Sequence, residues 1–173
     1  MPVIANLIIG IDGATTIDGS SGPLSSPADR KRFHQLRKRS HAIMIGGATA
    51  RAEPYELTPL PLIVVTRGGI VPGRAAENPL AVIAALSIEA AIKRYSAQFD
   101  SLLIEAGSNF LLQALRAELV DELYLTRVSK VGGAPYFITD PLSLNFKLHT
   151  ESGTSDELFS HYARLPSMQI EGK

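Results

Sequence analysis

The chain has 173 residues, with 17 Lys and Arg balanced by 17 Asp and Glu, and it contains no cysteine. A hydrophobic content of 45% over this length is enough for one core, so we expect a single domain spanning residues 1–173. Zero net charge argues against general nucleic-acid binding, and the lack of cysteine excludes disulfides, thiol catalysis and thiolate metal sites. The four histidines are scattered, so we expect no metal site. Because no apolar run approaches the roughly 18 residues of a membrane span and no basic leader is visible, we expect no membrane contact and a cytoplasmic protein.

The first part of the chain predicts a strand, a long turn and a helix. Residues 3–11 are nearly all apolar, which is typical of a buried strand. Residues 12–25 are rich in turn formers. The sequence SPAD at residues 26–29 then predicts a helix start, with a capping serine, a proline in the first turn and a carboxylate three residues after the cap. This helix should end near residue 39.

The remaining apolar runs alternate with helical patterns. Buried strands are expected at residues 42–45, 62–66, 81–86, 102–105 and 122–128, and helices at residues 88–97 and 109–116. Residues 146–150 and 158–165 predict a closing pair of strands, joined by a turn at residues 152–155. Such alternation predicts an α/β fold with a mostly parallel sheet and an antiparallel C-terminal edge. Ligands of such sheets bind beyond the carboxyl ends of the strands.

Three predicted strands end in unusual residues: IDG at 11–13, GGAT at 46–49 and EAGSN at 105–109. The last two are small-residue turns before predicted helices, where free backbone N–H groups and the helix dipole favour a phosphate. Two such sites on one sheet edge suit the pyrophosphate of a dinucleotide, although simple tight turns explain each one alone. The usual Rossmann, P-loop, zinc-protease and serine-hydrolase motifs are absent.

Several of these segments together resemble one enzyme family. They are IGIDG at residues 9–13, DGSSG at 18–22, SPADR at 26–30, LR at 36–37, SHAI at 40–43, EAG at 105–107 and VDEL at 120–123. This pattern resembles the reductase domain of the bacterial riboflavin-biosynthesis deaminase–reductase, which has a dihydrofolate reductase-like fold. The resemblance implies a three-layer α/β fold and an NADPH-dependent reduction of 5-amino-6-(5-phosphoribosylamino)uracil, in which the ribose is opened to a ribityl chain. The deaminase half of that enzyme needs cysteine zinc ligands, so this chain resembles the reductase half.

The resemblance also implies a set of cofactor contacts. They are Thr49, Glu53, Thr66, Arg67, Gly107, Ser108, Asn109, Phe110, Leu111 and Leu112. Thr49 matches a threonine that meets the cofactor phosphates, although an ordinary helix cap is the alternative. Residues 107–112 match the pyrophosphate turn and the start of its helix. Arg67 offers a fork for a 2′-phosphate, which favours NADPH over NADH, or it is a solvated surface arginine.

On the substrate side the resemblance implies contacts from Ser21, Asp29, Arg37, Leu57 and Glu105, with Glu105 and Asp12 as candidate catalytic residues. Glu105 ends a buried strand, where a carboxylate is costly without partners, and it suits an amine or ring N–H of a pyrimidine. Arg37 lies on the same helix face as Arg30 and suits an anionic group. Asp12 either shapes its loop or polarises the substrate.

The segment after the Thr49 turn departs from the family pattern. The family has an acidic-proline run that ends in a substrate-binding arginine, whereas residues 53–60 here read EPYELTPL and contain no arginine. Residues 27–33, 45–49 and 123–126 also resemble dihydrofolate reductase itself.

In the dihydrofolate reductase pattern Asp29 matches the pteridine-binding carboxylate, with Thr126 nearby; its alternative role is in the helix cap. The runner-up function is therefore a dihydrofolate or pterin reductase, and a third possibility is a non-catalytic NADPH-binding homologue. By analogy with relatives we expect a homodimer, formed through residues 123–128 and the late strands.

Overall fold

The computed structural model describes residues 2–139 and 145–166. The strands are β1 (Val3–Gly10), β2 (Ala14–Thr16), β3 (Ala42–Gly46), β4 (Leu62–Val65), β5 (Ala81–Ala84), β6 (Leu102–Ile104), β7 (Glu122–Val128), β8 (Gly133–Tyr136), β9 (Phe146–Gly153) and β10 (Glu157–Arg164). The helices are α1 (Pro27–Lys38), α2 (Gly47–Ala52), α3 (Ile88–Ser96) and α4 (Ser108–Arg116), with a 3-10 turn, η1 (Gly73–Glu77).

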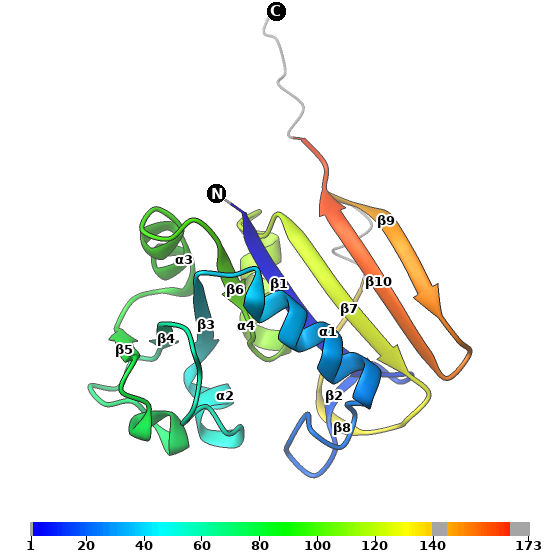
Figure 1. The fold of residues 1–173 in the computed structure, drawn as a ribbon, viewed down its shortest axis with the longest axis horizontal. Helices are drawn as coiled ribbons and strands as arrows, with labels where there is room; N and C mark the ends of the chain where they lie inside the picture. Colours follow the sequence, from blue (N-terminus) through cyan, green and yellow to red (C-terminus); the bar gives the residue numbers. More distant parts are fainter. Residues whose placement is uncertain (1, 140–144, 167–173) are drawn as a thin grey trace, which may run out of the picture.

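The main sheet has eight strands in the order β5-β4-β3-β6-β1-β7-β10-β9. All neighbours from β5 to β7 are parallel, whereas β10 pairs antiparallel with both β7 and β9. The predicted mostly parallel sheet with an antiparallel C-terminal edge is therefore confirmed (Figure 1). The central strand β1 has neighbours that come much later in the chain, β6 on one side and β7 on the other.

Successive side chains of each strand point to opposite faces of the sheet, so the core is divided between two helical layers. The odd positions of β1, from Val3 to Ile9, pack in a cluster that also contains residues of α3 and α4. Ile4 packs on the opposite face with Leu36 of α1 and Leu103 of β6. In Figure 1, α1 crosses one face of the sheet and α4 lies behind it. These three layers confirm the predicted dihydrofolate reductase-like arrangement.

Helix α1 begins where the SPAD sequence predicts. The Ser26 hydroxyl oxygen accepts the Asp29 backbone N–H at 3.0 Å, and Pro27 occupies the first turn. The sequence did not predict β2, β8 or η1, because these elements are short and lie in stretches rich in Gly and Pro with no hydrophobic period. It indicated the start of α2 after the GGAT turn, but not where this helix ends. Strands β2 and β8 pair as a separate two-stranded sheet.

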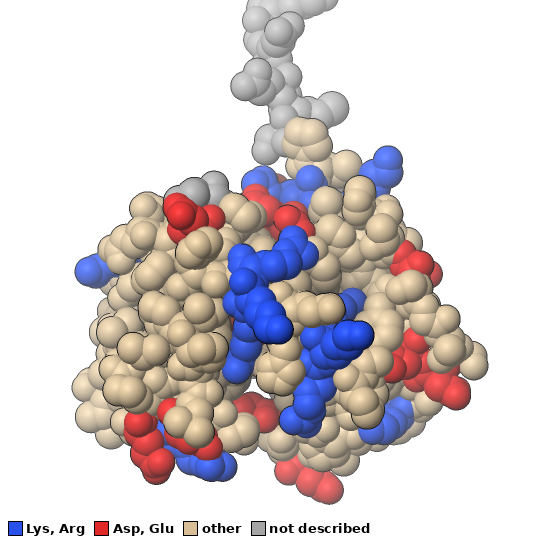
Figure 2. All heavy atoms as spheres, in the orientation of Figure 1, with Lys and Arg blue, Asp and Glu red and all other residues tan. Residues whose placement is uncertain are grey.

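The balanced charge of the chain is unevenly distributed on its surface. Lys and Arg side chains gather over the face covered by α1, with acidic side chains towards the periphery of that view (Figure 2). The sequence of α1, PADRKRFHQLRK, accounts for much of this basic face. None of the helices within the described residues is long and apolar enough to cross a membrane.

Candidate active site

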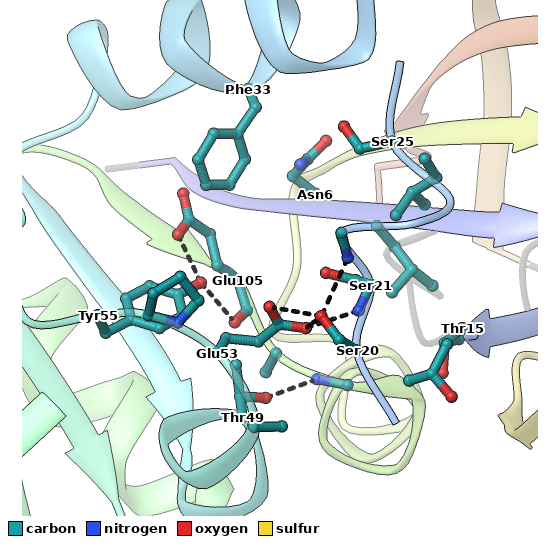
Figure 3. A pocket seen from close by; sticks show the side chains of 18 of the residues that line it. Asn6, Thr15, Ser20, Ser21, Ser25, Phe33, Thr49, Glu53, Tyr55 and Glu105 are labelled. Carbon is teal, nitrogen blue, oxygen red and sulfur yellow. Dashed lines mark hydrogen bonds between the residues drawn. The ribbon is translucent and has the colours of Figure 1, made fainter. Parts of the chain in front are cut away.

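A cavity of about 610 Å³ opens at the carboxyl ends of β1 and β6, under α1. It brings together seven of the residues expected from sequence: Ser21, Asp29, Arg37, Thr49, Glu53, Glu105 and Gly107. They come from segments far apart in the chain and surround one hollow (Figure 3). The prediction that ligands bind at this edge of the sheet thus has a matching cavity.

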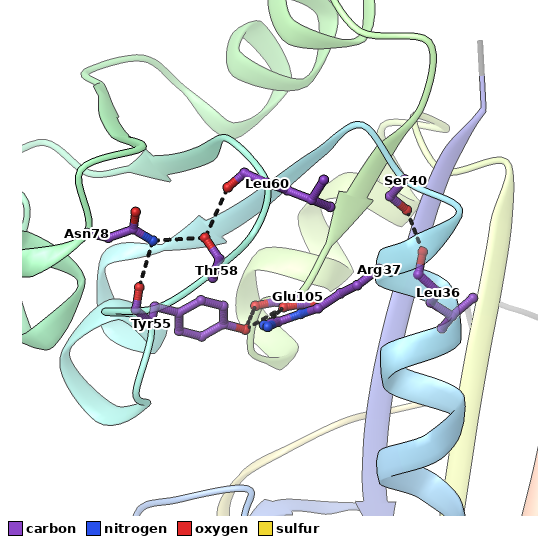
Figure 4. A network of polar contacts seen from close by, with 8 residues as sticks. All are labelled: Leu36, Arg37, Ser40, Tyr55, Thr58, Leu60, Asn78 and Glu105. Atoms are coloured by element: carbon purple, nitrogen blue, oxygen red, sulfur yellow. Dashed lines mark hydrogen bonds and ion pairs between the residues drawn. The ribbon is translucent and has the colours of Figure 1, made fainter.

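Glu105, directly after β6, is the most firmly held carboxylate in the cavity wall. Its Oε1 accepts Arg37 Nε at 2.9 Å, and its Oε2 accepts Arg37 Nη2 at 2.7 Å and the Tyr55 hydroxyl at 2.8 Å (Figure 4). The Arg37 guanidinium carbon also lies 4.2 Å from the centroid of the Phe33 ring. Since Glu105 is only 5% exposed, these three donors replace the water that its charge has lost.

The same contacts shift the pKa values of both partners of Glu105. Burial acts to lower the pKa of Arg37, but the hydrogen bonds and the charge of Glu105 raise it above its ordinary value. Burial, and then the charge of Glu105, raise the pKa of Tyr55 well above its ordinary value. Arg37 is therefore a cation and Tyr55 a neutral donor at neutral pH.

Tyr55 was missed from the sequence, where it lies in the run that departs from the family pattern. It is 6% exposed, and its backbone carbonyl accepts Asn78 Nδ2 at 2.9 Å. Asn78 Nδ2 also donates to Thr58 Oγ1 at 2.8 Å (Figure 4). An aromatic residue beside Pro54 carries no motif, so only the folded structure shows that its hydroxyl meets Glu105.

Glu53 faces the loop that borders the cavity. Its Oε1 accepts the Ser21 backbone N–H at 2.7 Å, and the Ser20 hydroxyl lies 3.3 Å from its Oε2 (Figure 3). The sequence placed Glu53 among the cofactor contacts. In the structure this carboxylate lines the first cavity and connects the segment after α2 to the loop containing Ser21.

Asp29 has a structural role and also lines the cavity. Its Oδ1 accepts the Thr126 hydroxyl at 2.6 Å, and its Oδ2 accepts the Ser25 hydroxyl at 2.7 Å. Arg32 Nη2 donates to Thr126 Oγ1 at 2.7 Å, and burial lowers the pKa of Arg32 despite the nearby Asp29 charge. The predicted proximity of Asp29 and Thr126 is thus a direct hydrogen bond.

A second cavity, of about 690 Å³, continues along the same sheet edge and shares Ala48 with the first. It is lined by four expected cofactor residues, Thr66, Arg67, Asn109 and Phe110, and by residues that the sequence did not indicate, including Arg51, Ser87 and Gln113. A Cβ added at Gly46 would lie 3.2 Å from the Phe110 ring, and one at Gly47 would lie 3.2 Å from Thr66 Oγ1. Glycine at these two positions therefore lets the Phe110 and Thr66 side chains pack closely against the backbone of the cavity wall.

The start of α4 lies between the two cavities. Its cap residue is Gly107, so among the described residues no cap side chain accepts the first N–H groups of the helix. A Cβ built at Gly107 would have no atom of the described residues within 4 Å. The Gly107 N–H donates to Thr49 Oγ1 at 3.2 Å. Uncapped N–H groups at the positive end of this helix provide an anion-binding surface.

The sequence profile of the RibD C-terminal domain matches residues 2–157. The chain belongs to the RibD C-terminal domain family. The family resemblance expected from the sequence is therefore confirmed. A search of curated protein sequences finds no match to the chain.

Solved structures share the fold of this RibD C-terminal domain at low sequence identity. A pyrimidine reductase-like protein from Corynebacterium diphtheriae is 21% identical with a TM-score of 0.73, over 95% of this chain and 92% of that one. Acinetobacter baumannii RibD is 19% identical with a TM-score of 0.74, over 96% of this chain, which spans 59% of that protein. Dihydrofolate reductase from Enterococcus faecalis, complexed with NADP(H), is 18% identical with a TM-score of 0.73, over 94% and 96%.

Some residues expected from the RibD resemblance lie outside both cavities. Leu57 is 85% exposed on the surface and lines neither cavity. Asp12 accepts the backbone N–H groups of Ala14 and Gly132 at 3.1 and 3.2 Å, so it shapes its loop, the first of its two expected roles. Ser108, Leu111 and Leu112 are buried in α4, and their side chains line neither cavity.

Proposed function

We propose that this RibD C-terminal domain is an NADPH-dependent reductase of riboflavin biosynthesis that acts on 5-amino-6-(5-phosphoribosylamino)uracil. One observation carries the proposal: two cavities on one sheet edge share Ala48, the first lined by Glu105 and the second by Thr66 and Arg67. This arrangement suits a reduced dinucleotide that reaches from one cavity into the other, with its nicotinamide beside the substrate. Membership of the family supports the same reaction.

The residues of the second cavity fit a nicotinamide dinucleotide. The uncapped start of α4 can accept the pyrophosphate beside the Thr49 hydroxyl. Arg67 and Arg51 are two cations for a 2′-phosphate, which is the group that distinguishes NADPH from NADH. When bound, the cofactor supplies the hydride.

In the first cavity the chain's own residues bind and orient the substrate. Glu105 accepts an N–H of the pyrimidine, and Ser21 borders the same space on the facing loop. Arg37 has two of its N–H groups on Glu105, so it acts first by holding that carboxylate in place. Binding in a fixed orientation contributes to rate by removing the entropy cost of alignment.

The test is NADPH oxidation with 5-amino-6-(5-phosphoribosylamino)uracil, followed by identification of the ribityl product. We expect turnover that Glu105→Gln reduces at least tenfold, because the carboxylate acceptor is lost. A complete lack of turnover, under conditions in which a pathway reductase is active, would refute the substrate assignment.

The second candidate is reduction of a pterin or dihydrofolate, and the Asp29–Thr126 hydrogen bond favours it. A carboxylate held by a threonine at the cavity wall suits the N–H edge of a pteridine. Asp29→Ala distinguishes the two functions: it should abolish turnover of dihydrofolate only if the second candidate is correct, whereas Arg37→Ala should then have the smaller effect. NADPH binding without turnover of either substrate would instead indicate a non-catalytic homologue.

A further inference from the structure

The register of the sheet places a second polar side chain beside Glu105. Ala5 of β1 lies opposite Ile104 of β6, so Asn6 is level with Glu105, one residue further along. Ile4 and Leu103, two residues earlier on these strands, both pack on the face covered by α1. Since strand residues alternate between faces, Asn6 and Glu105 also share that face.

Asn6 is unusual for its position. It is a polar residue in the central strand β1, whose sequence VIANLIIG is otherwise apolar or glycine. Its Oδ1 atom is buried and has no hydrogen-bond partner among the described residues. Buried polar atoms are almost always paired, so an unpaired one in a cavity wall is available to a molecule that enters the cavity.

Glu105 has one acceptor position left. A carboxylate offers about four lone-pair positions. Arg37 and Tyr55 fill three of these, one on Oε1 and two on Oε2. The free position is on Oε1. Neighbouring strands lie about 4.8 Å apart, so one planar molecule can reach both this position and the Asn6 amide.

The surroundings of these two groups favour a flat ring over a phosphate or sugar end. Phe33 of α1 also lines the cavity, and Figure 3 places its ring between Asn6 and Glu105 in that view. An aromatic face favours a planar ligand by stacking, and the Glu105 carboxylate repels a phosphate.

We propose that Asn6 is a substrate-specificity residue, whose side-chain amide, together with Glu105, binds one edge of a planar heterocycle that carries N–H groups. This inference rests on the proposed function and identifies the part of the substrate that the protein selects. An amide side chain pairs a donor with an acceptor, so it can match a lactam edge with two hydrogen bonds. Asn6 could not be selected from sequence, because a single asparagine in an apolar strand matches no motif.

The test is Asn6→Leu, which removes the amide and keeps a branched side chain of similar size. We expect KM for 5-amino-6-(5-phosphoribosylamino)uracil to rise about tenfold, the effect of a lost hydrogen bond, with kcat changed by less than about twofold. The affinity for NADPH should be unchanged. The melting temperature of the ligand-free protein should not fall, because the variant buries no unpaired polar atom. A purely structural role would give the reverse: lower stability with an unchanged KM.

Two further variants keep the result decisive. If Asn6→Leu does not fold, Asn6→Ala is used in its place and should raise KM to a similar extent. Asn145→Leu, outside the cavity, is the matched control with no expected effect on KM. Binding of the pyrimidine and of dihydrofolate is also measured by calorimetry with NADPH present. A wild type that binds a heterocycle without reducing it refutes the reductase assignment, and Asn6 is then judged by the change in Kd. Unchanged affinity in both Asn6 variants, or no binding of either heterocycle to the wild type, would overturn the inference.

Discussion

At the scale of single residues, the cavity depends on how its charged groups are held. Glu105 is a buried carboxylate that accepts two hydrogen bonds from Arg37 and a third from Tyr55. Asn78 in turn holds the backbone of Tyr55. Removing one of the three donors leaves the other hydrogen bonds to Glu105 in place but holds its carboxylate less firmly in position.

Tyr55→Phe tests this positioning role. The variant keeps the ring and removes the hydroxyl that donates to Glu105. We expect a loss of about 1–2 kcal/mol in the free energy of unfolding at neutral pH and a severalfold rise in KM for the substrate, measured by urea denaturation and steady-state kinetics. Tyr95→Phe, on α3 and away from the cavity, is the control. Equal behaviour of the two variants would contradict a role for Tyr55 in positioning Glu105.

Arg67→Ala tests the proposed cofactor preference. Arg67 is an exposed cation that lines the second cavity, and a 2′-phosphate there would gain a charge-assisted hydrogen bond. We expect the Kd for NADPH to rise about tenfold and the Kd for NADH to stay the same, both measured by fluorescence titration. The control is Arg116→Ala, which removes the same charge from the last turn of α4. A parallel loss of NADH binding in Arg67→Ala would show that the residue does not read the 2′-phosphate.

Much of the site, but not all of it, was predictable from sequence. Glu105 stood out because it ends a buried strand and matches the family's substrate-contacting glutamate, and Asp29 because it matches the pteridine-binding carboxylate of dihydrofolate reductase. Tyr55 and Asn6 did not, because their roles depend on contacts with Glu105 and on strand register across the sheet. Motifs report residues close in sequence, whereas these pairs are joined only by folding.

At the scale of elements, the loop at residues 17–22 forms one wall of the cavity and is fixed by Glu53. The carboxylate accepts the Ser21 backbone N–H at 2.7 Å and lies 3.3 Å from the Ser20 hydroxyl. Asp18 and Gly19 in this loop have positive φ angles, and the backbones of Ile17 and Ser20 pair on either side of them, so the turn is held locally. The contact from Glu53 joins this turn to a different element.

Glu53→Ala should release this loop. We expect faster hydrogen exchange at the Ser21 amide, because its acceptor is lost, and a severalfold higher KM for the substrate with little change in overall stability. Exchange is followed by mass spectrometry of the peptide that covers residues 17–25. Glu89→Ala, which removes an exposed carboxylate from α3, is the control. Unchanged exchange at Ser21 would show that the loop is held by other contacts.

The elements themselves were largely predictable, and their order in the sheet was not. Residues 122–128 match β7 in both ends, and the predicted helix at residues 88–97 exceeds α3 by one residue. Hydrophobic periodicity and helix-capping residues are signals within a short stretch of sequence, so they locate such elements. The placement of β6 between β3 and β1 is a long-range choice that no local pattern encodes.

At the scale of the whole molecule, we propose a homodimer that forms through the edge strand β9. Strand β7, part of the surface expected from the sequence, pairs with β1 on one side and β10 on the other, so it is not a free edge. Strand β9 is the edge of the sheet and is mostly exposed, including Leu148 at 43%. We expect sedimentation at twice the chain mass, and Leu148→Lys should shift the protein towards monomer. Sedimentation of the wild type as a monomer at every concentration would contradict the proposal.

The stability of the molecule should fall in alkali. The pKa of Tyr55 is above its ordinary value of 10.0 in the folded state because of burial and the Glu105 charge. Above about pH 10 the unfolded chain loses this proton first. Rising pH therefore favours unfolding until it reaches the pKa of Tyr55 in the folded state. Below about pH 10 the contribution of Tyr55 to the free energy of unfolding is constant. Urea denaturation between about pH 9 and pH 11 should show a steeper loss for wild type than for Tyr55→Phe; equal slopes would contradict this account. Tyr124, whose pKa is also raised, contributes equally in both proteins.

The position of β1 in the sheet has a consequence for how the chain reaches its folded state. Among the strands of this sheet, β1 is synthesised before the others; its sequence is the apolar VIANLIIG, and its hydrogen-bonding partners are residues 102–104 and 122–128. During synthesis this segment must wait for most of the chain before either edge is paired. Pairing over such sequence separations slows folding and exposes an aggregation-prone strand in the meantime. We therefore expect refolding yield to depend strongly on protein concentration, and fragments that end before β6 to be insoluble.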